Sequence, residues 1–184
     1  MSMPRHEAMQ CGYLIPGWLW PAEQGWLYDN MAHSRSHLEI GSYAGKSLFV
    51  TCAGFNQPAK AIAVDSVEGT ILGPVYQRRL FDAAEAFIEA NTTAEVEFLP
   101  MRSVEAFTEL SKRNITFDTM FIDGCHQYAE CKADIEMWST LLRPDGLLAG
   151  HDYWPKDVGV MDAVNETGPF QVAADTRIWY RYNS

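Results

Sequence analysis

The sequence predicts an α/β fold: a three-layer αβα sandwich around a seven-stranded, mostly parallel sheet with an antiparallel C-terminal hairpin. Two observations favour this class. Short apolar runs alternate with stretches of helical periodicity along most of the chain, and such a βαβα order produces a parallel sheet covered by helices on both faces. Near the C-terminus, PFQVAADTRIWYRYN instead contains two strand-like runs joined by a tight turn, which predicts an antiparallel pair.

The N-terminal segment, residues 1–36, is expected to contain a loose start followed by one helix. Pro16-Gly17 is a turn signal, and the apolar residues after it recur at helical spacing from about Ala22 to Met31. We assign residues 37–184 to the αβα core. The whole chain, 1–184, is taken as a single domain, because 184 residues is an ordinary size for one domain.

The core begins with HLEIG, a short apolar run that ends at a glycine loop, as a buried strand does. Helices and strands then alternate. The helices are expected over about 45–52, 76–90, 104–112, 128–142 and 158–166, the fourth ending before Pro144 and Gly146. After HLEIG, the further strands are expected over 59–66, 94–100, 117–124 and 146–153, followed by the two strands of the hairpin, whose turn lies around Asp175 and Thr176.

Composition and charge narrow the class of partner. The formal net charge of −10 would repel a phosphate backbone, which argues against nucleic acid or an anionic membrane and favours a small molecule. The four cysteines form no CxxC pair, so neither a zinc knuckle nor a redox dithiol is indicated. No apolar run has the length of a membrane span or of an export signal. A reducing, cytoplasmic location is therefore expected.

The loop in LEIGSYAGKSL, residues 38–48, resembles two phosphate-binding motifs but matches neither. A P-loop needs four residues between its first glycine and the Gly-Lys-Ser end, whereas only three separate Gly41 from Gly45. A dinucleotide fingerprint needs a second glycine where this loop has Tyr43, so the backbone could not approach a pyrophosphate closely. The loop therefore predicts a ligand without a phosphate at this position.

Polar residues follow four of the predicted parallel strands, namely Glu39–Gly41, Asp65–Ser66, Asp123–Gly124 and His151–Asp152. The carboxyl ends of parallel strands form the ligand crevice of such a fold. Asp65 lies about 24 residues past the start of the glycine loop, where an acid accepts the hydroxyls of a ribose. A nucleoside without phosphates fits both features, and S-adenosylmethionine is the common cofactor of this kind.

The charged amino-acid end of that cofactor would need an acid and hydroxyl groups, which Glu39, Ser42 and Ser47 could supply. Other interpretations stay open for each residue. Ser47 could only cap a helix, Glu39 could face solvent, and Asp65 could begin a turn.

Two groups near the crevice have the chemistry of a catalytic centre. His126 follows Asp123 by three residues and could accept a proton from a substrate hydroxyl, or could only pack the following helix. Asp123 and Asp152 end neighbouring strands, with His151 adjacent, and two carboxylates with a histidine could hold Mg²⁺. Asp152 could instead only fix the loop.

The sequence resembles the class I methyltransferases of the methyltransferase 24 family, relatives of macrolide-sugar and catechol O-methyltransferases. The resemblance extends from IPGWLWPAEQGWLYDNM through LEIGSYAGKSL and AIAVDS to the terminal DTRIWYRY, and its most specific part is FIDGCHQY followed by LLRPDGLLAGHDY. It implies a Rossmann-like core and S-adenosylmethionine as cofactor. Carried over by position, it implies the following roles: Glu39, Gly41, Tyr43 and Ser47 at the methionine end, with Ser42 beside them; Asp65 at the ribose, with Ser66 beside it; Ser103 at the adenine; and Asp123 near the sulfonium and the substrate.

Two positions depart from the family pattern. Arg102 precedes Ser103 where the family usually has an acid, and Cys125 replaces the acid of I-D-G-D-H, so one negative charge is lost beside the site.

We therefore predict a methyltransferase that methylates a hydroxyl of a small molecule of the sugar, polyketide or phenolic type. The alternatives are a catalytically inactive S-adenosylmethionine-binding protein and a nicotinamide-dependent oxidoreductase. The core leaves little sequence for a lid, so either the N-terminal segment or a second subunit of a homo-oligomer is expected to help bind the acceptor.

Overall fold

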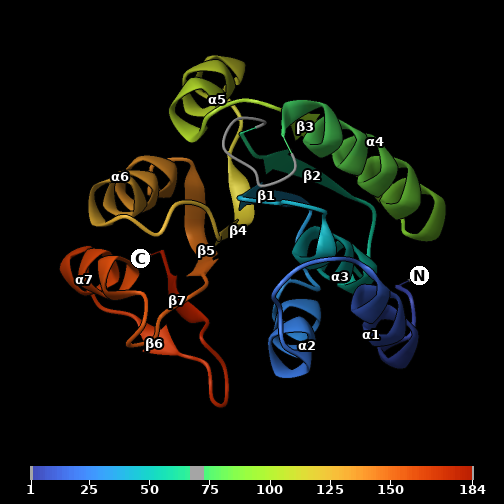
Figure 1. The fold of residues 1–184 in the computed structure, drawn as a ribbon, viewed down its shortest axis with the longest axis horizontal. Helices are drawn as coiled ribbons and strands as arrows, with labels where there is room; N and C mark the ends of the chain where they lie inside the picture. The colour runs from blue at the N-terminus through green and yellow to red at the C-terminus, as the bar shows by residue number, and fades with distance from the viewer. Residues whose placement is uncertain (1, 67–72, 184) are drawn as a thin grey trace.

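The computed structural model describes residues 2–66 and 73–183 (Figure 1). Its centre is one seven-stranded sheet in the order β3-β2-β1-β4-β5-β7-β6. The strands are β1 Ser36–Ile40, β2 Ala59–Val64, β3 Ala94–Leu99, β4 Phe117–Ile122, β5 Leu142–Gly150, β6 Gln171–Val172 and β7 Trp179–Tyr182. β1 to β5 pair in parallel, whereas β7 pairs antiparallel with both β5 and β6. The predicted αβα class and the antiparallel hairpin are confirmed.

Helices cover both faces of the sheet. They are α1 Arg5–Leu14, α2 Pro21–Asn30, α3 Lys46–Gly54, α4 Pro74–Asn91, α5 Ser103–Leu110, α6 Tyr128–Ser139 and α7 Val158–Glu166, with a 3-10 turn, η1, at Ser111–Arg113. Figure 1 shows α1 to α4 on one side and α5 to α7 on the other. Each layer buries its own apolar cluster, one containing Leu27 and Phe49, the other Ile135 and Trp138. No helix among the residues described is long and apolar enough to cross a membrane.

The register of the strands aligns the carboxyl ends of four of them. Ile40 of β1 pairs with both Val64 of β2 and Ile122 of β4, and Ile122 pairs with Gly150 of β5. The residues that follow these strands therefore lie at one edge of the sheet.

The expected loose N-terminal start is wrong, because α1 is a helix of 10 residues. Its fully buried residues are small, Ala8 and Gly12, while Met9 and Cys11 pack only partly buried against the core. A side chain at Gly12 would overlap Gln24 and Val50. Close packing through small residues leaves no apolar stripe, so helical periodicity could not reveal this helix.

The expected boundary between the fourth core helix and the fifth strand is also wrong. α6 ends at Ser139, and β5 already begins at Leu142, before Pro144 and Gly146. The β4–β5 register shifts between the Phe117–Leu142 and Thr119–Leu147 pairs. An irregular stretch of strand can hold a proline and a glycine, which a regular central strand excludes.

Candidate functional site

A cavity of about 990 Å³ opens at the carboxyl ends of the parallel strands. It is lined by the loops after β1, β3 and β4, by the residues after β2 and β5, and by the segment between α1 and α2. The predicted site residues in its lining are Gly41, Ser42, Tyr43, Ser47, Asp65, Ser66, Ser103, Asp123, His126, His151 and Asp152. Glu39, the remaining predicted site residue, lies buried on β1 beside Ser47.

The glycine loop is held close to the end of β4. Gly41 has φ of +88°, and a side chain there would overlap the carbonyl oxygen of Asp123. Its N–H donates to the Val64 carbonyl at 2.8 Å. Tyr43, with φ of +46°, donates its N–H to Asp65 Oδ2 at 2.7 Å. Only glycine fits at position 41, because both the positive φ and the close backbone contact exclude a Cβ.

Glu39 is fully buried, so the interpretation in which it faces solvent is wrong. Ser47 Oγ donates to Glu39 Oε1 at 3.0 Å. Glu39 Oε2 and the buried Ser42 Oγ have no hydrogen-bond partner among the described residues. Burial raises the pKa of Glu39 to about 8, although the hydrogen bond from Ser47 opposes the shift. A buried acceptor without a donor is costly, which suits a ligand that brings an ammonium group.

Asp65 follows β2 and lines the same cavity. Burial raises its pKa to about 6, against the hydrogen bonds from the Tyr43 and Ser42 backbone. One carboxylate oxygen is used by the Tyr43 N–H, so the other can accept from a ligand hydroxyl.

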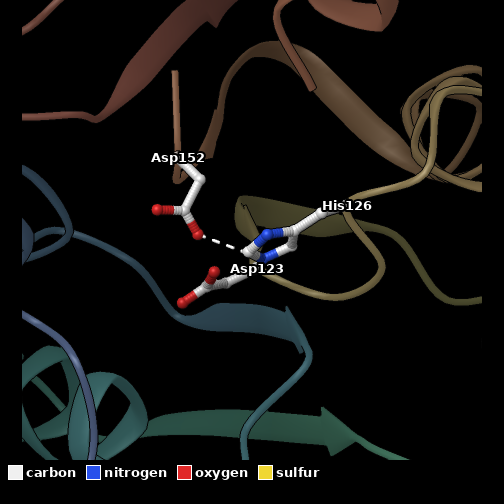
Figure 2. Close-up of side chains that lie close together, drawn as sticks. All are labelled: Asp123, His126 and Asp152. Carbon is white, nitrogen blue, oxygen red and sulfur yellow. Dashed lines mark ion pairs between the residues drawn. The ribbon is translucent and has the colours of Figure 1, made fainter. Parts of the chain in front are cut away.

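Asp123, His126 and Asp152 form a group of possible cation ligands, whose ligand atoms lie within 4.8 Å of one another. Figure 2 shows the three side chains converging from the ends of β4 and β5. His126 Nε2 is 3.1 Å from Asp152 Oδ2, and its Nδ1 is 3.0 Å from Asp157 Oδ1. Burial raises the pKa of Asp123 to about 6. The hydrogen bond to Asp152, more than that to Asp157, raises the pKa of His126 to about 9 against the effect of burial.

His151 lies deeper than this group. Its Nδ1 is 3.2 Å from Asp152 Oδ1 and 3.7 Å from Asp123 Oδ1, and its Nε2 is 3.1 Å from Glu23 Oε2. Burial lowers the pKa of His151, but the neighbouring carboxylates, Asp152 first and then Glu23, raise it to about 10. Both ring nitrogens thus face carboxylates, and the group formed by Asp123 and Asp152 is completed by His126 rather than by His151.

Two further residues connect distant parts of the chain to this centre. Arg177, in the hairpin turn, is 3.2 Å from Asp152 Oδ1 through Nη1 and 3.3 Å from Glu23 Oε1 through Nε. Its guanidinium lies 4.4 Å above the Trp20 ring and 5.0 Å above the Trp154 ring. Glu23, fully buried on α2, also accepts the Trp20 N–H at 2.7 Å.

The sequence prediction missed Glu23, Asp157 and Arg177. Glu23 and Arg177 are 154 positions apart in the chain, so no local pattern pairs them. One signal was available: Glu23 is an acid among apolar residues at the start of a helix, where it can accept the N-terminal N–H groups.

The segment between α1 and α2 forms one wall of the cavity. Lys46 Nζ donates to the Gly17 carbonyl at 2.9 Å, and the Trp18 ring lies 5.3 Å from the Tyr43 ring. The N-terminal segment is therefore placed beside the glycine loop.

A family model described as "Methyltransferase domain", that of the methyltransferase 24 family, matches residues 38–153. The chain belongs to this family. The match confirms the predicted family, and the fold of this methyltransferase domain is that of the class I S-adenosylmethionine-dependent enzymes. The matched segment contains all the predicted site residues, whereas Glu23, Asp157 and Arg177 lie outside it.

An uncharacterized protein of Sinorhizobium fredii, y4gI, is 23% identical over 180 residues, covering 88% of this chain but only 19% of that protein. The chain thus spans about a fifth of that relative.

Two solved structures show the same fold. An O-methyltransferase from Bacillus cereus, in complex with SAH, superposes with a TM-score of 0.68 at 16% identity, over 98% of this chain and 90% of that one. MycE, a methyltransferase from the mycinamycin biosynthetic pathway in complex with Mg and SAH, has a TM-score of 0.64 at 14% identity, over 100% of this chain and 55% of that one.

Proposed function

We propose that this protein transfers a methyl group from S-adenosylmethionine to a hydroxyl oxygen of a small molecule. The observation that carries the proposal is the composition of one cavity. It joins Ser42 of the glycine loop, whose buried hydroxyl has no partner among the described residues, and Asp65 to the group formed by Asp123, His126 and Asp152. Family membership and the fold support the same activity.

The residues of the glycine loop fit the cofactor. Glu39 Oε2 and Ser42 Oγ would meet the ammonium of the methionine end, next to Gly41, Tyr43 and Ser47. Asp65, with Ser66 beside it, would accept the ribose hydroxyls, and Asp123 would lie near the sulfonium. A sulfonium and an ammonium are both cationic, which suits an acidic cavity.

The chemistry is an in-line displacement. The bond between the methyl carbon and sulfur breaks as a bond to the acceptor oxygen forms, and the thioether leaves as S-adenosylhomocysteine. The proton of the acceptor hydroxyl goes to His126 Nε2, while Asp157 holds Nδ1 and so fixes the orientation of the ring. Asp123, half-buried at the end of β4, would orient the acceptor.

A divalent cation such as Mg²⁺ would be held by Asp123 and Asp152 and would lower the pKa of the substrate hydroxyl. The predicted nitrogen ligand is His151, whose Nδ1 is 3.2 Å from Asp152 Oδ1 and 3.7 Å from Asp123 Oδ1, so that His126 Nε2 stays available to accept the proton. The donor set fits such an ion, because two carboxylates converge with an imidazole within one small volume.

For the acceptor we propose a sugar, polyketide or phenolic hydroxyl. Pro16 to Leu19 line the cavity, which favours the N-terminal segment over a second subunit as the acceptor wall. A homo-oligomer stays a prediction, as does a cytoplasmic location, which the four free cysteines support.

Two other functions are separated from this one by simple tests. An inactive binding protein would bind S-adenosylmethionine without methylating any acceptor. A nicotinamide oxidoreductase would bind NAD, but the crowded Gly41 and the Tyr43–Asp65 hydrogen bond leave the first loop unsuited to a pyrophosphate.

Replacing Asp65 by alanine is expected to weaken S-adenosylmethionine binding by about 1.5–3 kcal/mol, because hydrogen bonds from the ribose to a charged group are lost. Isothermal titration calorimetry measures the change. Asp65→Asn keeps an acceptor for the Tyr43 N–H and should lose less. Unchanged affinity in both variants would remove Asp65 from the site, and tight binding of NAD without any response to S-adenosylmethionine would overturn the proposed function.

Mg²⁺ is expected to raise the rate at pH 7 by about 10- to 100-fold. A cation bound to Asp152 neutralises the carboxylate charge that stabilises protonated His126, and so lowers the pKa of His126 by about one to two units. Chelation should therefore slow transfer at pH 7 and matter little at pH 10. In Asp152→Asn, which lacks that carboxylate charge, the pH profile should not respond to Mg²⁺. Identical wild-type profiles with Mg²⁺ and with chelator would exclude this role.

A further inference from the structure

The cavity lining contributed by the β3–α5 region and α6 combines apolar side chains with one buried carboxylate. It includes Met101, Val104 and Met137, which come from the β3–α5 region and from α6. Asp134, on α6, lies among them and is only 8% exposed. Glu130, one helical turn earlier, also lines the cavity but is exposed. A flat ring with one polar edge would suit such a compartment.

Asp134 is fixed by a chain of hydrogen bonds. Trp138 Nε1 donates to Ser103 Oγ at 2.8 Å, and Ser103 Oγ in turn donates to Asp134 Oδ1. The single proton of Ser103 is therefore committed to Asp134. The predicted adenine residue Ser103 thus holds a neighbouring carboxylate in place and has no proton left to donate to a ligand.

The second oxygen of Asp134 has no donor. No hydrogen bond joins Oδ2 to any of the residues that the structure describes. This oxygen lies next to the end of β4, because a Cβ built on Gly124 would be 3.7 Å from it. Gly124 lines the same cavity. A carboxylate oxygen can only accept, so Oδ2 is free to accept a hydrogen bond from a donor on a ligand in the cavity.

We infer that Asp134 Oδ2 accepts a hydrogen bond from the exocyclic amino group of the adenine of S-adenosylmethionine and thereby selects adenine over 6-oxo purines. The inference rests on the proposed function. Adenine is flat and apolar on its faces, and its 6-amino group is its donor. The residue before Ser103 is a cation, Arg102, which pairs with Glu105 at 2.7 Å, so the carboxylate beside Ser103 comes from α6.

The wild-type protein tests this by calorimetry with S-adenosylhomocysteine and two analogues, one with a 6-oxo group (the inosine form) and one with hydrogen at position 6. At pH 8, above the Asp134 pKa of about 6 that burial produces, the carboxylate is ionised. We expect the adenine compound to bind about 10- to 100-fold more tightly than the 6-oxo analogue, whose carbonyl would face the carboxylate, with the 6-hydrogen analogue between them.

Two variants locate the effect. In Asp134→Asn the amide oxygen can keep the Ser103 hydrogen bond, so the amide NH₂ occupies the place of Oδ2 and donates to a 6-oxo group. The preference for adenine should vanish or invert. Glu130→Gln removes a charge from the same helix and the same cavity lining, and it should keep the wild-type preference.

The possible failures are distinguishable. If the wild type does not bind S-adenosylhomocysteine, the proposed function fails and the inference fails with it. If the wild type binds the adenine and 6-oxo compounds equally, the inference is overturned while the proposed function stands, whether or not Asp134→Asn folds. An adenine preference that persists in folded Asp134→Asn, or that disappears in Glu130→Gln, assigns the recognition to another residue.

Discussion

Replacing His126 by alanine is expected to slow methyl transfer about 100- to 10,000-fold, the usual contribution of a general base. The imidazole lies in the group that faces the acceptor end of the cavity, 3.1 Å from Asp152 and 3.0 Å from Asp157. It is separate from the glycine loop that would hold the cofactor. Affinity for S-adenosylmethionine should therefore stay nearly unchanged. Single-turnover kinetics measure the rate of methyl transfer, and calorimetry measures the affinity for the cofactor.

The pH dependence of the wild-type rate gives an independent readout. Because the hydrogen bond to Asp152 raises the pKa of His126 to about 9, the imidazole holds a proton at neutral pH and cannot accept another. Without a divalent cation, the rate should rise about tenfold per pH unit up to about pH 9 and then level off. This rise should be absent in His126→Ala and present in the control His6→Ala, since His6 is exposed on α1.

The opposite result would assign His126 to packing. His126→Ala would then unfold at lower temperature than the wild type, while its folded fraction would turn over at the wild-type rate and keep the same pH profile. Asp123 would become the leading catalytic candidate, because the other carboxylate of the group, Asp152, already pairs with Arg177.

The parallel core could be predicted because its signals are local. A buried strand such as β2, AKAIAV, is a short run of small and branched apolar residues, and the helix after it has a polar and an apolar face. α1 escaped prediction because Ala8 and Gly12 pack by being small, which leaves no periodic pattern. The start of β5 was predicted too late in the sequence. Pro144 and Gly146 usually indicate the end of an element, but an irregular strand can contain them.

The residues of the candidate site likewise fall into two groups, those that local sequence signals predict and those that only tertiary packing brings to the site. Asp65, Asp123 and Asp152 each follow a strand, and the order of the strands alone brings them to one edge of the sheet. Asp134 lies on a helix. Its place in the site depends on the hydrogen bond from Ser103, 31 positions away, and on which side of α6 faces the cavity. Such residues belong to the site through tertiary packing, which neither periodicity nor a motif describes.

Glu23 illustrates the same limit and carries the largest expected effect on stability. Glu23→Ala is expected to lower the free energy of unfolding by about 3–5 kcal/mol, because removing one partner of a buried ion pair leaves the other charge uncompensated. Its carboxylate is fully buried and faces Arg177 at 3.3 Å and His151 at 3.1 Å. Loss of the bond to the Trp20 N–H also removes a cap from α2. Urea unfolding followed by circular dichroism measures the change.

Asp29→Ala is the matched control on the same helix. Asp29 pairs with Arg5 at 3.0 Å, but both side chains are about half exposed, so the loss should stay below about 1 kcal/mol. Glu23→Gln, which keeps an acceptor but no charge, should fall between the two. Equal small losses in all three variants would mean that Arg177 and His151 find other partners. A large loss confined to the Glu23 variants would make α2 a structural part of the catalytic centre, since Arg177 and His151 are also the residues that hold Asp152.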